Sequence, residues 1–244
     1  MIKVIINGAN GRMGSATVAA IAHEKDLQLV ASVGRNDDLV SAIKKHNADV
    51  VIDWTLPASV FNNAQKIIDA GARPVIGTTG LSPEQIKILS QQCETKKIGG
   101  IIAPNFSIGA ILMMKYAQDA AKYFPDVEII EYHHPKKCDA PSGTAKKTAE
   151  LIAQVKKEKN TSAETDAQLK NNVARGENCH DVPIHSVRLM GVFANQEVIF
   201  GGDGETFTIQ HHATNRNAMM PGVFLCCRKV MSLNHLVCGM EKLI

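Results

Sequence analysis

The stretch "KVIINGANGRMG" (3–14) runs from an apolar, β-branched segment into a glycine-rich turn and then into a helix-like segment. Apolar segments of this kind are typical of strands that are buried on both faces of a parallel sheet. Further segments of the same kind are LQLVASV (27–33), ADVVIDW (48–54), PVIGT (74–78) and IGGIIAP (98–104). Helix-like stretches separate them at 15–24, 57–71 and 83–96. This alternation predicts a doubly wound α/β domain with a parallel sheet.

The pattern changes after Pro104 and predicts a second domain of the α+β class. Its expected elements are helices at 109–124 and 142–157 and strands at 126–134, 185–190, 196–201 and 205–212. The last three strands alternate more strictly between apolar and polar residues, which predicts antiparallel strands with one covered face. The polar stretch 159–172 is expected to be a surface loop. We therefore predict domains at 1–104 and 105–215, with the helix-containing segment 216–244 completing the first.

Composition and charge exclude several classes of protein. The 244 residues are 45% hydrophobic and 21% charged, which is ordinary for a soluble globular protein. A net charge of +3 without a clustered basic stripe argues against a nucleic-acid partner. The six cysteines form no CxxC pair, so reduced thiols of the cytosol are expected. The segment MIKVIING lacks a signal-peptide layout and no apolar run is long enough to span a membrane, so we expect a cytoplasmic protein.

The glycine turn GANGRMG (8–14) predicts a site for a dinucleotide. Glycines permit a tight turn and a close backbone approach to a pyrophosphate, which the N-terminus of the following helix attracts. The spacing is G-x-x-G-x-x-G, with Asn10 where the usual fingerprint has its second glycine. Taken alone the motif is weak, but its place between the first strand and the first helix favours nucleotide binding. GTTG (77–80) and APNFSIG (103–109) also follow strands, where ligands bind in this architecture, although ordinary turns would look the same.

The end of the second strand bears on the choice between NADH and NADPH. An acidic residue at this place binds the ribose 2′-hydroxyl of NAD, whereas an arginine suits a 2′-phosphate. Here Gly34 and Arg35 occupy the tip, and Asp37 and Asp38 come slightly later. We expect NADPH to be used well, with NADH also used if one of the two aspartates turns toward the ribose. The alternative is that Arg35 is only a solvated loop residue.

The block "EYHHPKKCDAPSGTA" (131–145) concentrates positive and titratable groups. A strand that ends at His133 and His134 points their side chains to opposite sides, and Pro135 then turns the chain. Ser142 is placed to cap the next helix, whose first N–H groups, at Gly143 and Thr144, predict an anion site. The expected anion is a carboxylate of a substrate.

Plainer interpretations of these residues have to be weighed. A pair of histidines is more often structural than catalytic, and two loop lysines are usually solvated. A metal site from His133, His134 and Cys138, or from CHDVPIH (179–185), would lack the spacing of a structural zinc site. We therefore predict no metal site.

The sequence resembles the 4-hydroxy-tetrahydrodipicolinate reductase (dihydrodipicolinate reductase) family of the diaminopimelate–lysine pathway. The resemblance rests on GANGRMG, GTTG, APNFSIG and above all the HH-x-x-K-x-D-x-P-S-G-T-A block, and it runs from residue 2 almost to the C-terminus. It implies a Rossmann-type N-terminal domain and a second domain that binds substrate and builds a homotetramer around a mixed sheet. It also implies reduction of a cyclic, unsaturated dicarboxylate with NADH or NADPH.

The resemblance assigns roles to individual residues. His133 matches the catalytic acid/base of the family and Lys137 its proton donor. Two departures matter, because many members have an acidic residue at Gly34 and His at Asn195, and we assign no role to Asn195. The matched substrate-binding positions are His134, Gly143 and Thr144. The matched cofactor-binding positions are Gly8, Ala9, Asn10, Gly11, Arg12, Met13, Arg35, Gly77, Thr78, Thr79, Ala103, Pro104, Asn105, Phe106 and Arg216.

Reduction of a conjugated C=C–C=N system requires a hydride at one carbon and a proton at its neighbour. The hydride has to come from a nicotinamide cofactor, since no side chain can donate one. Neighbouring positive groups are expected to weaken the hold of Lys137 on its proton, and imidazole can exchange one near neutral pH. Two rival functions are another Rossmann dehydrogenase that acts on an amino acid or semialdehyde and a catalytically silent NADP(H) sensor. The SGTA anion site beside HHPKK is not needed by the first, and intact His133 and Lys137 argue against the second.

Overall fold

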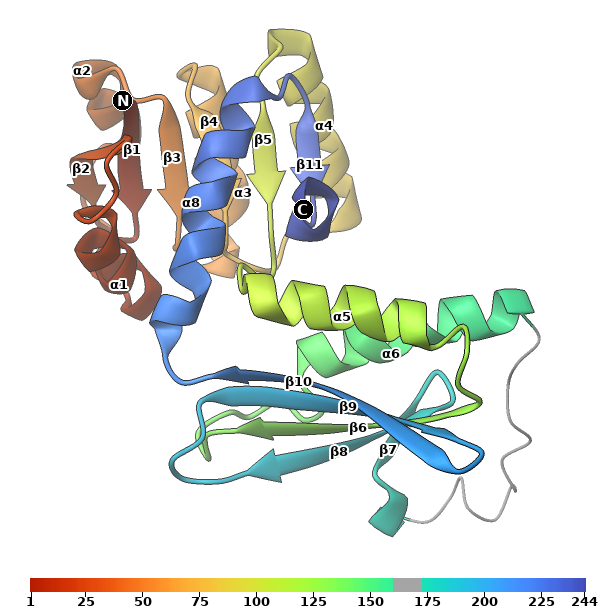
Figure 1. Ribbon diagram of the computed structural model, residues 1–244. Coiled ribbons are helices and arrows are strands. Elements are labelled where there is room, and N and C mark those ends of the chain that lie inside the picture. The colour runs from red at the N-terminus through yellow and green to blue at the C-terminus, as the bar shows by residue number, and fades with distance from the viewer. Residues whose placement is uncertain (160–172) are drawn as a thin grey trace. The chain divides into compact units, whose positions relative to one another are not determined.

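The structure is a computed structural model that describes residues 1–159 and 173–244 (Figure 1). The polar stretch predicted as a surface loop, 159–172, lies outside the described residues apart from Lys159. The chain forms two compact units: unit 1 comprises Met1–Ile108 with Arg216–Ile244, and unit 2 comprises Gly109–Asn215. No helix among the described residues is long and apolar enough to cross a membrane.

Unit 1 is built on a parallel sheet of six strands in the order β11-β5-β4-β3-β1-β2. The strands are β1 (Ile2–Asn7), β2 (Leu27–Val33), β3 (Val50–Asp53), β4 (Arg73–Ile76), β5 (Gly100–Ile102) and β11 (Leu236–Cys238). The central residues of β1 and β3, such as Ile5 and Val51, are fully buried, as expected for strands covered on both faces. The predicted Rossmann-type parallel sheet is therefore confirmed. The sequence analysis missed β11, since three residues leave too short an apolar pattern.

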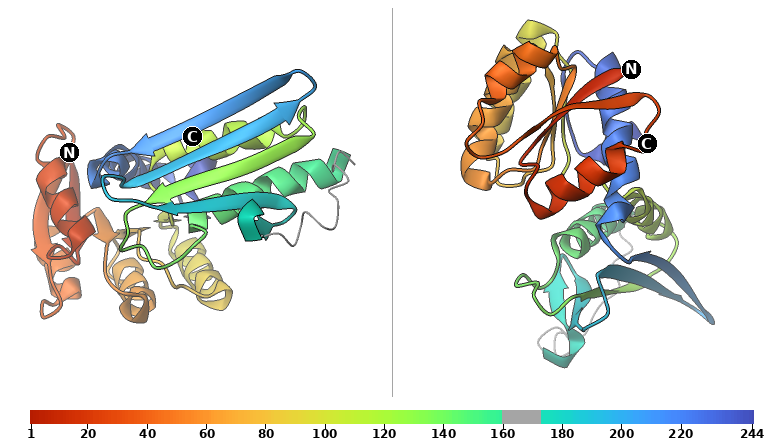
Figure 2. Two further views of the ribbon diagram at one scale, coloured as in Figure 1. Left: turned by 90° about the horizontal axis from the view of Figure 1, so that it is seen from below. Right: turned by 90° about the vertical axis from the view of Figure 1, so that its left-hand side faces the viewer.

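Helices cover both faces of this sheet (Figure 2, right). α2 (Leu39–His46), α3 (Pro57–Asp69) and α4 (Pro83–Lys96) lie on one face, and α1 (Arg12–Ile21) and α8 (Met220–Lys229) on the other. Ser82 caps α4 by accepting a hydrogen bond from the Gln85 N–H at 3.2 Å, and Pro83 occupies the first helical position. Short 3₁₀ turns complete the C-terminal segment: η2 (Arg216–Met219), η3 (Val230–Ser232) and η4 (Met240–Leu243).

The strand order places a ligand crevice beside β1. Neighbours of β1 lie on both sides, β2 on one and β3 on the other, so the direction of the connections reverses there. Ligands of such sheets bind outside the carboxyl ends of the strands at this reversal. The glycine turn that starts at Gly8 and the segment that starts at Trp54 follow β1 and β3 directly, and they therefore flank the crevice.

Unit 2 contains a mixed sheet of five strands in the order β10-β9-β6-β8-β7. The strands are β6 (Asp126–His133), β7 (Glu177–Cys179), β8 (Val182–Arg188), β9 (Ala194–Gly202) and β10 (Glu205–Ala213). The predicted α+β fold with a mixed sheet is confirmed. One detail differs from the prediction: β8 pairs with β6 in parallel, and only its pairing with β7 is antiparallel. Strict alternation of apolar and polar residues reports one covered face, and it does not report strand direction.

The helices of unit 2 cover one face of its sheet. α5 (Ile108–Ala120) and α6 (Gly143–Lys159) lie on this face, and η1 (Val173–Arg175) follows the undescribed segment (Figures 1 and 2). Ile129 of β6 with Val198 and Phe200 of β9 point into the core and are fully buried. The described residues place no α-helix on the other face, where Ile130, Tyr132 and Ile199 remain only partly buried.

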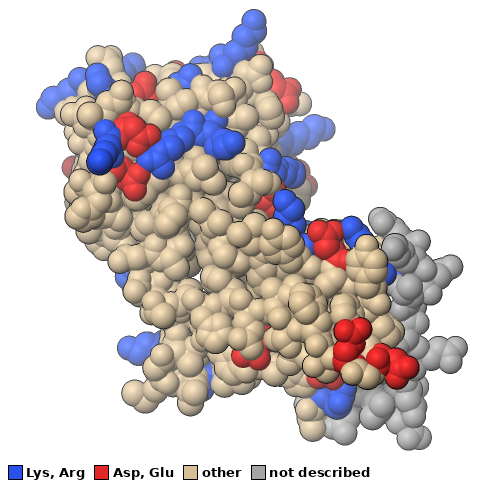
Figure 3. All heavy atoms as spheres, viewed as in Figure 1, with Lys and Arg blue, Asp and Glu red and all other residues tan. Residues whose placement is uncertain are grey.

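Charged side chains of both signs meet at the surface. Lys and Arg side chains lie beside Asp and Glu side chains over unit 1 on the face that Figure 3 shows. Arg228 of α8, for example, forms ion pairs with Glu24 and with Asp26, the latter at 2.6 Å. The hydrogen bond from Arg228 lowers the pKa of Asp26 to about 2. Such mixed pairing is in keeping with the small net charge of +3.

Candidate functional site

The glycine turn after β1 is packed so tightly that Gly8 and Gly14 leave no room for a Cβ. Gly8 has a φ of +80°, and a Cβ there would lie 2.6 Å from the carbonyl oxygen of Trp54. A Cβ at Gly14 would lie 2.2 Å from the Gly8 carbonyl oxygen. Gly11 is the N-cap of α1 and supplies no side chain to cap its first N–H groups. A turn of this shape at an uncapped helix N-terminus fits the pyrophosphate of a dinucleotide.

A buried carboxylate joins the ends of three neighbouring strands in unit 1. Asp53, the last residue of β3, has no exposed surface. Its Oδ2 accepts a hydrogen bond from the Asn7 amide at the end of β1, at 2.8 Å. Its Oδ1 accepts from the Thr78 hydroxyl after β4 and from the Thr55 hydroxyl, each at 2.7 Å. The carboxylate therefore fixes the loops that contain several of the predicted cofactor-binding residues.

The other loops at this edge of the sheet are also fixed by close contacts. A Cβ at Gly77 would lie 1.9 Å from the Trp54 ring, so only glycine fits there. The Trp54 ring meets the buried Phe106 ring edge-on, with 5.4 Å between the centroids. Arg216 begins η2, which contacts α1. The remaining predicted cofactor residues of unit 1 are Ala9, Asn10, Arg12 and Met13 beside the glycine turn, Thr79 after β4, and Ala103, Pro104 and Asn105 after β5.

The acidic residues near the tip of β2 are held by local hydrogen bonds. Asp37 accepts a hydrogen bond from the Gly34 N–H at 2.7 Å. Asp38 caps α2 by accepting from the N–H groups of Val40 and Ser41, and the hydroxyl of Ser41 lowers the pKa of Asp38. Arg35, two residues before Asp37, is exposed. In this conformation both aspartates are bonded to their own loop, whereas the Arg35 side chain is exposed to solvent.

The predicted catalytic histidine is anchored by a glutamate that the sequence analysis did not single out. Glu131 of β6 is fully buried, and its Oε2 lies 2.5 Å from Nδ1 of His133, two residues later on the same side of the strand. Arg188, at the end of the parallel neighbour β8, donates from Nη2 to Oε1 at 2.9 Å and from Nη1 to Oε2 at 3.0 Å. The backbone N–H of Ser142 also donates to Oε1, at 3.2 Å.

These hydrogen bonds decide the charge of the glutamate. Burial by itself would raise the pKa of Glu131, but the hydrogen bonds from His133, Arg188 and Ser186 outweigh it and lower the pKa to about 2. Glu131 is therefore ionised at neutral pH. An ionised carboxylate can only accept hydrogen bonds, so the hydrogen between it and His133 belongs to Nδ1 of the imidazole.

The loop after β6 carries the predicted catalytic lysine. The backbone N–H of Lys137 donates to the His134 carbonyl oxygen at 3.1 Å, which closes a turn. The Lys137 ammonium donates to both carboxylate oxygens of Asp139, each at 2.8 Å. Asp139 therefore places a negative charge next to Lys137. The sequence analysis had considered only the positive neighbours of this lysine. Arg188 reaches the same loop by donating to the Asp139 carbonyl oxygen at 2.7 Å.

The start of α6 has the shape expected of an anion site. Ser142 caps the helix, because its hydroxyl accepts a hydrogen bond from the Ala145 N–H at 3.2 Å. Gly143 is exposed, and a Cβ there would meet no atom within 4 Å. Thr144 is partly buried beside it. His134 lies on the same loop, where its ring centroid is 6.4 Å from that of Phe193. The N-terminus of a long helix is thus open to a carboxylate, which its dipole attracts.

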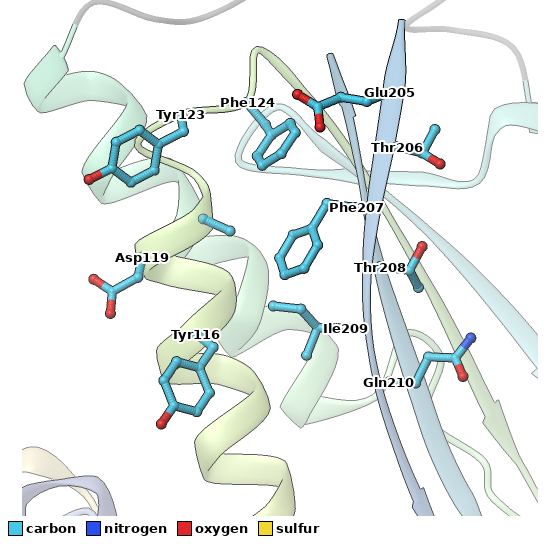
Figure 4. Close-up of a pocket in the computed structure, with 11 residues that line it drawn as sticks. Tyr116, Asp119, Tyr123, Phe124, Glu205, Thr206, Phe207, Thr208, Ile209 and Gln210 are labelled. Carbon is cyan, nitrogen blue, oxygen red and sulfur yellow. The ribbon is translucent and has the colours of Figure 1, made fainter.

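A separate hollow in unit 2 lacks the chemistry to bind a carboxylate. It has a volume of about 660 Å³ and lies between α5 and β10 (Figure 4). In the strand register it is at the opposite end of the sheet from His133. Its ionisable groups include the acids Asp119 and Glu205, which would repel a dicarboxylate. Its lining residues are Tyr116, Asp119, Ala120, Tyr123, Phe124, Glu205, Thr206, Phe207, Thr208, Ile209 and Gln210.

Of the residues that the sequence analysis missed, some had a signal in the local sequence and others had none. Glu131 and Asp139 stand inside the EYHHPKKCDAPSGTA block, so their acidity beside the basic residues was a usable signal. Arg188 lies 57 residues from Glu131 in the sequence, and only the parallel pairing of β6 with β8 brings the two together. Among the described residues, His, Cys, Asp and Glu form no group of three that could hold a metal ion.

Comparison with known proteins connects both units to one family. The family model "Dihydrodipicolinate reductase, N-terminus" matches residues 2–106, and "Dihydrodipicolinate reductase, C-terminus" matches residues 109–244. A 4-hydroxy-tetrahydrodipicolinate reductase of Coxiella burnetii is 57% identical over 243 residues, covering 100% of this chain and 99% of the relative. One from Legionella pneumophila is 49% identical over 244 residues, covering 99% of each chain. The dipicolinate-bound dihydrodipicolinate reductase of Paenisporosarcina sp. TG-14 superposes with a TM-score of 0.91 at 40% identity, covering 100% of both chains.

The lowered pKa of Glu131 predicts a pH-dependent contribution to stability. Its pKa is about 2 in the folded chain, compared with 4.5 for an unperturbed glutamate. The ionised form is therefore favoured by folding, and its stabilising contribution is present above about pH 4.5 and is lost as the pH falls toward 2. We expect denaturant unfolding to show Glu131→Gln as less stable than the unmodified chain near neutral pH, with the gap narrowing in acid. A gap that stays constant with pH would contradict the proposed ionisation.

Proposed function

The chain belongs to the dihydrodipicolinate reductase family, and we propose that His133 and Lys137 handle the proton of its reaction. It is an NAD(P)H-dependent oxidoreductase that reduces 4-hydroxy-tetrahydrodipicolinate in the biosynthesis of lysine and diaminopimelate. The bound nicotinamide cofactor supplies the hydride. The observation that carries the proposed roles is that one strand, one loop and one helix start bring together His133, Lys137 and an open anion site.

We assign the substrate carboxylate to the start of α6. The Paenisporosarcina relative is dipicolinate-bound, which supports a small cyclic dicarboxylate as ligand. The N–H groups of Gly143 and Thr144 would hold one carboxylate, and His134 would contribute from the adjacent loop. A carboxylate held there is oriented by fixed hydrogen bonds and by the helix dipole, and no flexible side chain has to be ordered for this.

The proton has two candidate carriers with different surroundings. The Lys137 ammonium carries a proton that it can give directly, and Asp139 orients it through two hydrogen bonds. His133 can exchange a proton through Nε2, because Nδ1 is engaged by Glu131. General acid catalysis needs such a group within hydrogen-bond reach of the carbon or nitrogen that becomes protonated. We assign Lys137 as the proton donor and His133 as the acid/base.

The cofactor-binding role belongs to unit 1. We propose that the glycine turn and α1 bind the pyrophosphate, that the loops after β4 and β5 approach the nicotinamide ribose, and that Arg216 lies near the cofactor. Arg35 would bind the 2′-phosphate of NADPH. The local hydrogen bonds of Asp37 and Asp38 support this choice, because both carboxylates are engaged with N–H groups of their own loop and are not extended toward a ribose hydroxyl.

We also propose that the chain works as a homotetramer assembled through unit 2. The sheet face without an α-helix supports this, because it leaves the apolar side chains of Ile130, Tyr132 and Ile199 only partly covered. Met190 in the loop after β8 is 83% exposed, which is unusual for a residue of its size and polarity. Sedimentation of the purified chain should show a species of four subunits, and charged substitution at Ile199 should dissociate it. A monomer at micromolar concentration would contradict the proposal.

A cytoplasmic location is proposed on the state of the cysteines. All six are free thiols, and burial raises the pKa of Cys93 to about 11 and that of Cys226 to about 12. Cys93 and Cys226 therefore stay protonated and unreactive, and free thiols are usual in a reducing compartment. Fractionation of cells would test the location.

Substitution of Arg35 should separate the two cofactors. Arg35→Ala removes the cation opposite the 2′-phosphate, so the KM for NADPH should rise roughly tenfold, in line with the loss of one charge-assisted hydrogen bond. The KM for NADH should stay the same, because its ribose carries no phosphate. Steady-state rates measured with both cofactors at one salt concentration would check this. An unchanged KM for NADPH would remove Arg35 from the site.

Substitution of the proton-handling residues should lower turnover more than binding. The assay follows cofactor oxidation with the substrate generated in situ from pyruvate and aspartate semialdehyde. The unmodified chain should oxidise NADPH or NADH rapidly in this assay. His133→Ala and Lys137→Ala should each lower kcat by roughly 10²–10⁴-fold, the usual contribution of a general acid, with the cofactor KM little changed. Lys136→Ala, the neighbouring exposed lysine, serves as the matched control. Full turnover in both variants would overturn the role assignment.

A further inference from the structure

The Glu131 carboxylate is more elaborately held than a structural ion pair requires. It is fully buried, and it receives hydrogen bonds from the Arg188 side chain, the Ser142 backbone, the Ser186 side chain and the His133 ring. Burial of a charged group is costly unless hydrogen bonds compensate it. Arg188 alone would neutralise the carboxylate, so the short contact with His133, at 2.5 Å, has to be explained separately.

The contact determines which nitrogen of His133 carries the fixed hydrogen. Ionised Glu131 accepts hydrogen bonds only, so Nδ1 of His133 is the donor in the neutral and in the charged imidazole alike. Nε2 is then the nitrogen that gains and loses a proton. A histidine without such a partner would divide itself between two tautomers, only one of which leaves Nε2 able to accept.

We propose that Glu131 is a positioning residue of the reductase, and that it holds His133 with Nδ1 protonated so that Nε2 alone exchanges the catalytic proton. Glu131 does not itself take up the proton: during turnover the proton moves between Nε2 and the reactants or solvent, and the carboxylate stays ionised. Arg188 of β8 supports this arrangement. It donates hydrogen bonds to the Glu131 carboxylate and to the Asp139 carbonyl oxygen in the loop that carries Lys137. This inference rests on the proposed proton-handling role of His133.

The first test is a double-substitution cycle between Glu131 and His133. In the otherwise unmodified chain, Glu131→Gln should lower kcat by about tenfold or more and leave the KM for NADPH unchanged, because the lost group orients a catalytic imidazole. In a His133→Ala background the same substitution should change kcat by less than about twofold, since residues that act as one unit are not additive. Equal losses in both backgrounds would overturn the inference, and full activity of His133→Ala itself would instead overturn the proposed function.

A second variant separates positioning from the unpaired charge that Glu131→Gln leaves on Arg188. Glu131→Gln with Arg188→Gln restores neutrality at the buried site. If Glu131 acts through His133, the pair of substitutions stays as slow as Glu131→Gln alone. Recovery of turnover in the neutral pair would show that the clamp was only structural and would overturn the inference.

The imidazole nitrogens can be observed without any activity measurement. In the unmodified chain labelled with ¹⁵N, the His133 signals, identified by their loss in His133→Ala, should show a protonated Nδ1 and an Nε2 that titrates. In Glu131→Gln the Nε2-protonated tautomer should become populated. An Nε2-protonated neutral tautomer in the unmodified chain would overturn the inference even if the variants failed to fold.

Discussion

The hydrogen bonds of the Asp53 carboxylate hold together the edge of the unit 1 sheet at which the predicted cofactor-binding loops lie. The carboxylate is fully buried at the end of β3, and its oxygens accept hydrogen bonds from Asn7 at the end of β1 and from Thr55 and Thr78 in the loops around it. A carboxyl group in such a place is tolerated because hydrogen-bond donors surround both of its oxygens. The consequence is that the turns beside the predicted pyrophosphate and nicotinamide positions are held rigidly relative to one another.

Unit 2 also contains a buried carboxylate that is held by hydrogen bonds from several segments. Glu131 is also buried near the end of a strand, and it also collects donors from a neighbouring strand and from a loop. One of its donors is His133, the proposed acid/base, so here the buried carboxylate also fixes which ring nitrogen of that histidine carries the hydrogen. In both units the fold brings donors from several segments to one charge, which offsets the cost of burying it.

The sequence analysis predicted the Rossmann-type sheet, the mixed sheet and the block that ends β6, because each rests on a pattern that is local in the chain. Apolar strands of this length, a glycine turn before a helix and a Ser-Gly-Thr helix start are all visible over a dozen residues. It missed β11, whose three residues are too few for a pattern, and it assigned an antiparallel direction to β8. The roles of the positions matched to the family stay predictions.

The sequence by itself determined the family, the two sheets and the identity of His133 and Lys137 as candidates, since these follow from residue types at short spacing. Only the tertiary structure decided which acids hold them. Glu131 meets Arg188 because β6 and β8 pair in parallel, and Asp53 meets Asn7 and Thr78 because β1, β3 and β4 end at one edge. A side chain's protonation depends on the charges and donors around it in space, and these come from segments that lie far apart in the chain.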